Sequence, residues 1–206
     1  MSKKSTIKRW KQYSKISGVG AITRRYFVMN AFDGALTMLG VVIGAYISGM
    51  IAETTVIISA GIAGSIAMGA SGVSGAYMTE KAERKKKIKQ LEKAMLTDLE
   101  KKGIHHKSHR FATFFAAIVD GFSPALAAMI VISPFFLASF KIISAEMAFF
   151  SSISITLLVL VLLGGYLAKI SDESVIKYGI QMLIVGLITA GLCIGTSILL
   201  GGTLAV

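Results

Sequence analysis

The chain has 206 residues, of which 54% are hydrophobic and only 16% are charged, and its mean hydropathy is +0.70. Most of its charged residues fall in two blocks, residues 3–25 and 80–110. A soluble domain carries about 25% charged residues, spread over its surface, so this distribution excludes a soluble globular enzyme. The single cysteine, Cys193, excludes a scaffold of internal disulfides.

Long apolar stretches predict an all-α membrane protein with five transmembrane helices. A helix needs about 20 residues to cross roughly 30 Å of hydrocarbon, and each stretch is long enough. Segment 26–78 holds the first two spans and segment 111–206 the other three, at about residues 26–52, 54–78, 111–140, 147–168 and 178–204. The third span contains Pro124 and Pro134, so we expect it to be kinked, or broken near residues 120–124.

Lysine and arginine predict the orientation. The basic N-terminal segment 1–25 carries eight of them and the loop 79–110 carries eleven. With Lys169 and Lys177, five spans place 21 of the 22 on one side and leave Lys141 on the other. The positive-inside rule then predicts a cytoplasmic N-terminus and an outside C-terminus. The net charge of +11 is then explained by the attraction of basic cytoplasmic segments to anionic membrane lipids, and we do not expect nucleic acid as a partner.

The loop after the second span is predicted to be helical over about residues 79–102, with Gly103 as its stop. We expect this amphipathic helix to extend the second span and to lie on the membrane or on a partner helix. A solvated charged helix is the equal alternative. Its apolar stripe, at helical spacing, consists of Ile88, Leu91, Met95 and Leu99.

An internal repeat is suggested by two similar segments. Asp33-Gly34 and Asp120-Gly121 each follow a basic residue into an apolar span. Residues 75–78 and 164–167 end the following spans with similar sequences. The chain is therefore predicted to contain two parallel hairpins and an unpaired fifth helix.

Asp33 and Asp120 are the main candidate site residues. Each lies about 10–14 Å inside its apolar stretch at 1.5 Å per residue, and no predicted span contains a lysine or arginine. An unpaired carboxylate at that depth costs at least about 2.5–3.5 kcal/mol. Protonation, water in a cavity or a bound cation would each remove that cost, which points to an ion or proton route. The alternative is a carboxyl group that caps a broken helix.

Weaker candidates flank these residues, and each has a structural alternative. Glu80 and Glu83 lie on one helix face and could pass a cation to the membrane, or pair with the neighbouring lysines and arginines. His105 and His109 could bind metal or simply be solvated. Small residues at helical spacing predict close helix packing in a compact bundle and fit a homodimer, at Gly40, Gly44, Gly75, Gly191 and Gly195.

Two motifs resemble the vacuolar iron transporter family of plants, yeast and prokaryotes. The first is Asp33-Gly34-x-x-Thr37-x-x-Gly40-Val41-Val42-x-Gly44, which resembles the first-helix motif of that family. The second, residues 71–83, resembles its second-helix signature, and the five spans and the charged loop also agree. The resemblance covers about residues 26–206 and suggests a divergent, prokaryotic member.

The resemblance implies a homodimer that moves Fe²⁺, and often Mn²⁺, out of the cytosol in exchange for protons. It places Asp33 and Thr37 on the transport pathway. The family has a methionine and a glutamate on its second helix, and a gap-free match puts these positions at Gly72 and Ala76. Met68, one turn before Gly72, could supply the thioether, and Asp120 could replace the carboxylate. Otherwise Met68 is ordinary packing.

These observations together predict a transporter of divalent metal by proton antiport in a prokaryotic plasma membrane, with Fe²⁺ or Mn²⁺ as substrate and no tightly bound cofactor. The alternatives are a transporter of another cation or small solute, and a membrane scaffold that transports nothing. No His-Glu-x-x-His or Gly-x-Ser-x-Gly motif lies in the spans, so we do not expect an enzyme.

Overall fold

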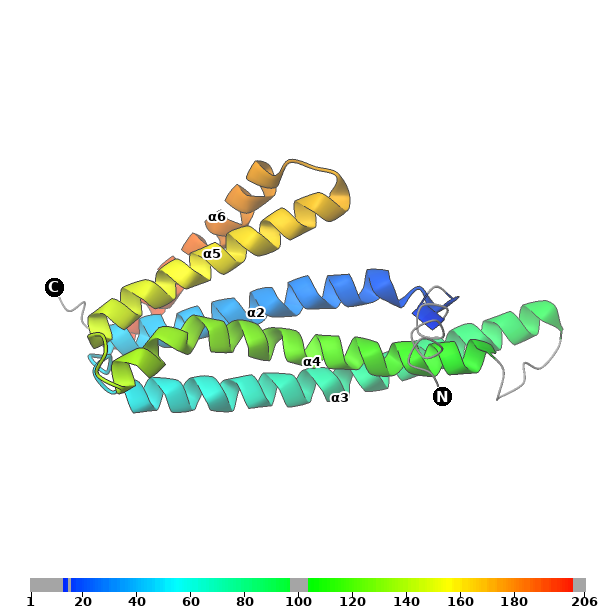
Figure 1. Ribbon diagram of the computed structural model, residues 1–206, viewed down its shortest axis with the longest axis horizontal. Helices are drawn as coiled ribbons and strands as arrows, with labels where there is room; N and C mark the ends of the chain where they lie inside the picture. Colours follow the sequence, from blue (N-terminus) through cyan, green and yellow to red (C-terminus); the bar gives the residue numbers. More distant parts are fainter. Residues whose placement is uncertain (1–12, 15, 97–103, 202–206) are drawn as a thin grey trace. The chain divides into compact units, whose positions relative to one another are not determined.

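The computed structural model describes residues 13–14, 16–96 and 104–201, without the side chains of residues 104–106. Within these residues the fold is all-helical (Figure 1). The helices are α2 (Val19–Ile47), α3 (Thr54–Met95), α4 (Ile104–Ser139), α5 (Ala145–Ser171) and α6 (Val175–Leu199). All five are long and apolar enough to cross a membrane, which confirms the predicted fold class and number of spans.

Helix α2 differs from the first predicted span at both ends. It begins at Val19 and includes Arg24 and Arg25, and Gly18, with φ +63°, interrupts the helical backbone between Ser17 and Val19. It ends at Ile47, and Gly49, with φ +70°, starts the turn to α3. Apolar character alone therefore placed this span about five residues too far toward the C-terminus, because residues 48–52 are apolar but form a turn.

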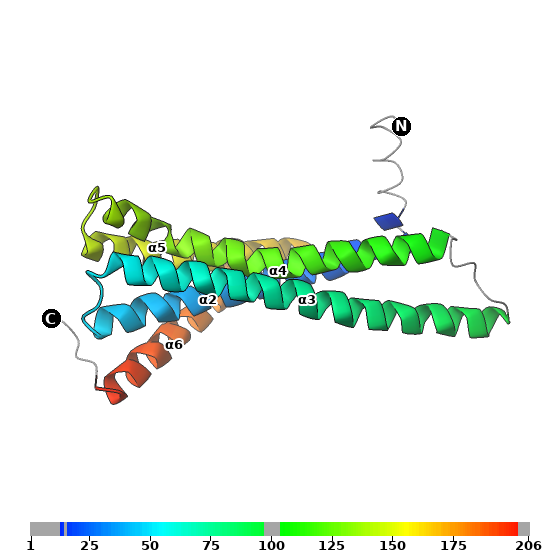
Figure 2. The same ribbon diagram turned by 90° about the horizontal axis from the view of Figure 1, so that it is seen from below.

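Helix α3 is a single helix of 42 residues, continuous through the apolar segment and the charged segment (Figure 2). The predicted extension of the second span is therefore confirmed as far as Met95. Leu96 has φ +51° and follows the helix end, whereas Leu99 and the predicted stop at Gly103 lie outside the described residues. Of the predicted apolar stripe, Ile88 is buried, but Leu91 and Met95 are exposed.

Helix α4 runs unbroken through both prolines, so the predicted break near residues 120–124 is wrong. At Pro134 the missing N–H leaves the carbonyl of Ile130 without its usual donor. The Ser133 hydroxyl donates to that carbonyl at 2.7 Å, which satisfies it locally. A proline with such a neighbour can remain inside a membrane helix.

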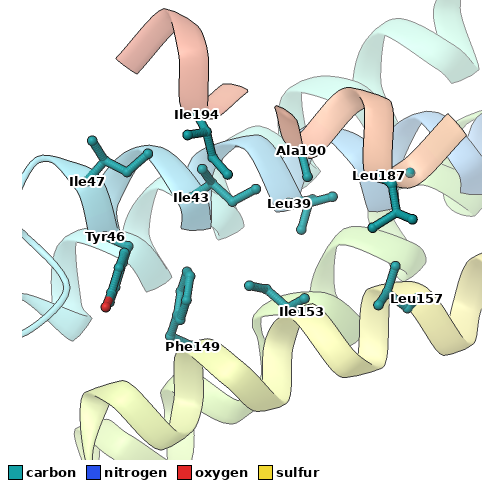
Figure 3. A pocket seen from close by; sticks show the side chains of 11 residues that line it. Leu39, Ile43, Tyr46, Ile47, Phe149, Ile153, Leu157, Leu187, Ala190 and Ile194 are labelled. Carbon is teal, nitrogen blue, oxygen red and sulfur yellow. The ribbon is translucent and has the colours of Figure 1, made fainter. Parts of the chain in front are cut away.

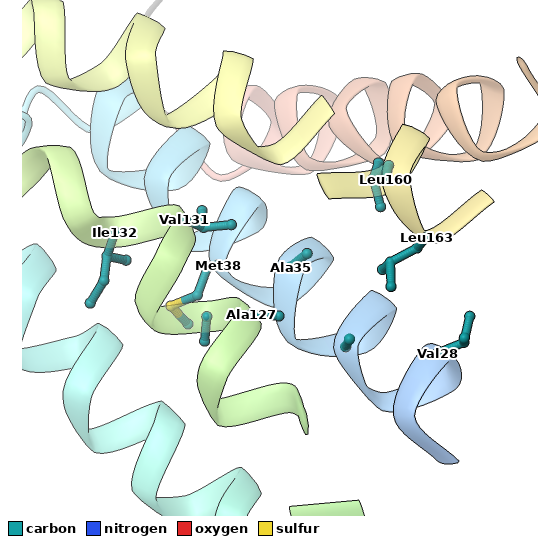
Figure 4. Packing of buried hydrophobic residues seen from close by; sticks show 10 residues of the cluster. Val28, Ala35, Met38, Ala127, Val131, Ile132, Leu160 and Leu163 are labelled. Carbon is teal, nitrogen blue, oxygen red and sulfur yellow. The ribbon is translucent and has the colours of Figure 1, made fainter. Parts of the chain in front are cut away.

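Packing divides the chain into two compact units, Met1–Phe27 with Gly69–Ser123, and Val28–Met68 with Pro124–Val206. The first has a small core of Val19, Ala112 and Ala116. The larger core of the second comes from α2, α4 and α5 (Figure 4). Because lipid is as apolar as these side chains, close van der Waals contact stabilises such cores more than burial from water does.

Helices α5 and α6 form an antiparallel hairpin. Ser144 and Ser174 cap their N-termini by accepting from the backbone N–H groups of Met147 and Lys177, at 3.1 and 3.5 Å. Gly164 lets the pair approach closely, since a Cβ there would lie 2.8 Å from the Tyr178 carbonyl oxygen. An apolar cavity of about 170 Å³ lies among α2, α5 and α6 (Figure 3).

Candidate functional site

Asp33 lies at the midpoint of the 29-residue helix α2, about 20 Å from either end at 1.5 Å per residue. It caps no helix, so the structural alternative for this carboxyl group is wrong. Its side chain is exposed, and no hydrogen bond or ion pair joins it to any residue that the structure describes. The carboxylate therefore faces away from the packed core of its own unit.

The residue after Asp33 explains how this position is held. Gly34 is buried against the backbone of Pro124 on α4, so closely that any Cβ would collide with it. Ala35 and Met38 continue the buried face of α2 into the core of the second unit (Figure 4). The glycine therefore fixes the rotation of α2 about its axis, and that rotation turns Asp33 outward.

The outward side of α2 carries three polar or soft groups in line. Met29, Asp33 and Thr37 follow each other at intervals of four residues, and all three are exposed. Such spacing places them on one helix face. We call these three residues the α2 face. Thr37 was expected here from the motif. Met29 was interpreted from the sequence as a packing residue, although its four-residue spacing from Asp33 already indicated that the two share a helix face.

Asp120, in the first unit, has a different environment. It lies inside the continuous helix α4, is only partly exposed, and takes part in interactions with neighbouring groups. Helices α3 and α4 meet closely here: a Cβ on Gly72 would lie 2.7 Å from the Gly121 Cα and 3.1 Å from the Asp120 Oδ2. The Asp120 carboxylate thus lies against the position where the resemblance expects a methionine.

Met68 belongs to the second unit, where it is partly buried and packs against the main core. This contact agrees with its alternative role as packing.

Glu80 is buried and forms an ion pair with Arg84, with 2.8 Å between Oε2 and Nε. The Tyr26 hydroxyl donates to Glu80 Oε1 at 3.1 Å. Arg84 Nη1 donates to the Ser17 carbonyl at 3.3 Å and lies 3.5 Å from His109 Nδ1. This polar cluster joins α2, α3, α4 and Ser17, which precedes α2. Ion pairing, the alternative given for Glu80, is therefore the arrangement present.

Of the other candidates for metal entry, His109 joins this cluster through Arg84, whereas Glu83 does not. Glu83 is exposed, and the side chain of His105 lies outside the described residues. In the part of the chain that the structure describes, no three His, Cys, Asp or Glu side chains are placed to hold a metal ion together. Sequence reasoning missed the burial of Arg84, because arginine within a run of charges normally indicates a solvated face.

The predicted packing glycines are only partly correct. Gly40 packs against Cys193, whose Sγ would lie 3.3 Å from a Cβ. Gly44, Gly75, Gly191 and Gly195 have open space where a Cβ would lie, so close packing at these four is wrong within a single chain. The closest approaches occur at other glycines, namely Gly34, Gly61, Gly72, Gly121, Gly164 and Gly186.

Comparison with known proteins decides the family. A sequence profile of the VIT family matches residues 86–197, more than half of the chain. The chain belongs to the VIT family. The match begins after the motifs on α2 and α3, so it supports the family independently of them. An uncharacterized protein from Methanocaldococcus jannaschii is 40% identical over 171 residues, which cover 82% of this chain and 85% of that protein. The protein is thus a transporter-like membrane protein with five candidate spans.

Proposed function

We propose that this VIT-family protein exports a divalent transition metal, Fe²⁺ or Mn²⁺ or both, from the cytosol in exchange for protons. The proposal depends above all on Asp33, an exposed carboxylate at the midpoint of an apolar helix with no bonding partner among the described residues. Facing lipid, this charge would cost at least about 2.5–3.5 kcal/mol. A water-filled route that carries cations removes that cost.

A second copy of the chain completes the route in this proposal. The α2 face turns away from the core of its own unit, so a two-fold axis beside α2 would bring two such faces together. Two carboxylates, two thioethers and two hydroxyls would then line one passage. Thioether and carboxylate ligands together suit borderline metals such as Fe²⁺ better than Mg²⁺ or Ca²⁺. The open glycines Gly44, Gly191 and Gly195 are free for close packing between copies.

Asp120 is proposed as the second carboxylate of the pathway. The resemblance expects a ligand at residue 72, but a side chain there would collide with the backbone of α4. The close approach of Gly72 and Gly121 admits the Asp120 carboxylate in its place. A carboxylate from α4 then does what a side chain of α3 does in the family pattern.

Competition for one carboxylate supplies the coupling. A carboxylate binds a proton or a metal ion, and metal binding requires the deprotonated form. If each ion must displace the other at Asp33, metal leaving the cytosol is exchanged for entering protons. We place the protein in the plasma membrane of a prokaryote with a cytoplasmic N-terminus, following the distribution of its lysines and arginines.

The experiment is metal uptake into proteoliposomes with and without a pH gradient. Fe²⁺ and Mn²⁺ should enter vesicles loaded at lower internal pH, and Asp33→Asn should reduce the rate to that of empty vesicles. Glu53→Gln, at an exposed position in the turn between α2 and α3, is the matched control and should transport normally. Normal uptake by Asp33→Asn would refute the role of Asp33.

A competition panel separates the alternatives. Transport of Na⁺, K⁺ or an organic solute that excess Mn²⁺ does not inhibit would indicate another substrate. A scaffold that transports nothing predicts no uptake of any kind, and loss of its role on reversal of the basic charges in residues 81–93.

A further inference from the structure

A cleft of about 430 Å³ opens on the first unit. Among the described residues its lining is aromatic and basic, with no acidic side chain: Tyr13, Tyr77, Lys107, Arg110, Phe111 and Phe114. None of these residues belongs to the α2 face or to the Glu80–Arg84 cluster. The cleft is therefore chemically separate from the proposed ion route.

The cleft lies where the apolar and charged parts of two helices meet. On α3, Tyr77 ends the apolar segment, and the charged segment starts at Glu80 and Lys81. On α4, Lys107 and Arg110 precede the apolar segment, which begins at Phe111. Aromatic and basic side chains at such a boundary are typical of the membrane–water interface.

The geometry of the lining suits an amphipathic anion. Lys107 and Arg110 are exposed, and the Nζ of Lys81 lies 5.6 Å from the centre of the Tyr77 ring. The Tyr13 and Phe111 rings are 6.1 Å apart and tilted by 48°. Phe114 is 61% exposed and Tyr77 is 42% exposed. Cations and uncovered rings in one cleft offer phosphate contacts beside an apolar surface.

We propose that this cleft binds the headgroup of an anionic phospholipid. Lys107 and Arg110 contact the phosphate, and the rings of Phe111, Phe114 and Tyr77 pack on the glycerol and the first part of the acyl chains. Basic pockets between membrane helices bind lipid headgroups in this way. A soluble phosphate would use the cations but would leave the rings exposed, so the lining favours a lipid.

The test measures lipids retained by the purified full-length protein, using native mass spectrometry after release from nanodiscs of phosphatidylglycerol and phosphatidylcholine in equal amounts. The wild type should keep phosphatidylglycerol in clear excess. Each basic residue near an anionic surface contributes about fivefold in affinity, so Lys107→Gln/Arg110→Gln should lower the preference about 25-fold. Lys85→Gln/Lys89→Gln changes the net charge equally at exposed positions outside the cleft and should keep it.

Two further measurements test whether binding in the cleft is specific for the phospholipid. Lys107→Arg/Arg110→Lys keeps both cations and should retain the lipid. Inorganic phosphate at millimolar concentration should not displace it. Equal losses in both double glutamine variants would show a general charge effect and overturn the proposal. Displacement by inorganic phosphate, or a wild type without preference for phosphatidylglycerol, would overturn it as well.

Discussion

Two acidic residues, one in each unit, have opposite environments: Glu80 has bonding partners within the chain, and Asp33 has none among the described residues. Glu80 in the first unit is buried and receives an arginine and a tyrosine hydroxyl as partners. Asp33 in the second unit is exposed at the midpoint of its helix, and no described residue bonds to it. A charge that is buried in protein, as at Glu80, or surrounded by an apolar segment, as at Asp33, must be compensated by the chain itself or by something outside it. The environment of Glu80 indicates a structural role, and the environment of Asp33 indicates a functional one.

The largest change in stability is expected at Glu80. Glu80→Gln removes one partner of a buried ion pair and leaves Arg84 charged and buried, which costs about 3–5 kcal/mol. Unfolding of the purified protein in a detergent–denaturant titration measures this loss. Glu83→Gln, three residues away and exposed, should change the unfolding free energy by less than about 0.5 kcal/mol. Equal effects of the two variants would mean that the pair does not hold α3 in place.

A smaller loss is expected where α3 and α4 meet. Gly121→Ala places a Cβ against the carbonyl of Gly69 and 2.7 Å from the backbone nitrogen of Val73, so the helices must separate. Overpacking of this kind costs about 1–3 kcal/mol. The same titration measures it, with uptake as a second readout, because separation also moves Asp120 from Gly72. An unchanged unfolding free energy would disprove the close approach.

Gly75→Ala should increase the free energy of unfolding, whereas Gly121→Ala should lower it. Its Cβ would meet open space, and alanine in place of glycine inside a helix stabilises by about 0.5–1 kcal/mol. Thermal unfolding in detergent is sufficient to detect this gain. Destabilisation instead would show that something outside the chain packs on this side of α3.

The smallest change in stability is expected at Asp33 itself. Asp33→Asn removes a charge without breaking any contact to the described residues, so the unfolding free energy should change by less than about 0.5 kcal/mol. Stability measured by the same titration should be unchanged while uptake is lost. A destabilisation comparable to that of Glu80→Gln would place Asp33 in a structural role.

The sequence was sufficient to predict the five spans and the helical extension of α3, because long apolar runs and charge blocks are properties of single segments. It was not sufficient for helix contacts. Gly44 and Gly191 have the spacing of packing glycines, yet Gly34 and Gly121 make the close contacts. Spacing defines a helix face, but only the tertiary structure decides which neighbour covers it. The internal repeat stays a prediction.

The residues of the candidate site also differ in whether the sequence alone could identify them. Asp33 could be found from the sequence, since a carboxylate within an apolar run is anomalous by itself. The burial of Arg84 could not, because the groups around the Glu80–Arg84 pair come from distant segments: Ser17, which accepts from Arg84, is 67 residues away from it, and Tyr26, which donates to Glu80, is 54 residues away from that glutamate. Compensation between distant segments leaves no local signal.

The most direct measurement of the central claim is Mn²⁺ binding to the purified protein, followed by the loss of the electron paramagnetic resonance signal of free Mn²⁺. The wild type should bind Mn²⁺, Asp33→Asn should bind at least tenfold more weakly, and the exposed variant Glu83→Gln, with the same change of charge, should bind as the wild type does. Equal affinities of the wild type and Asp33→Asn would contradict the assignment of the α2 face as the ion route.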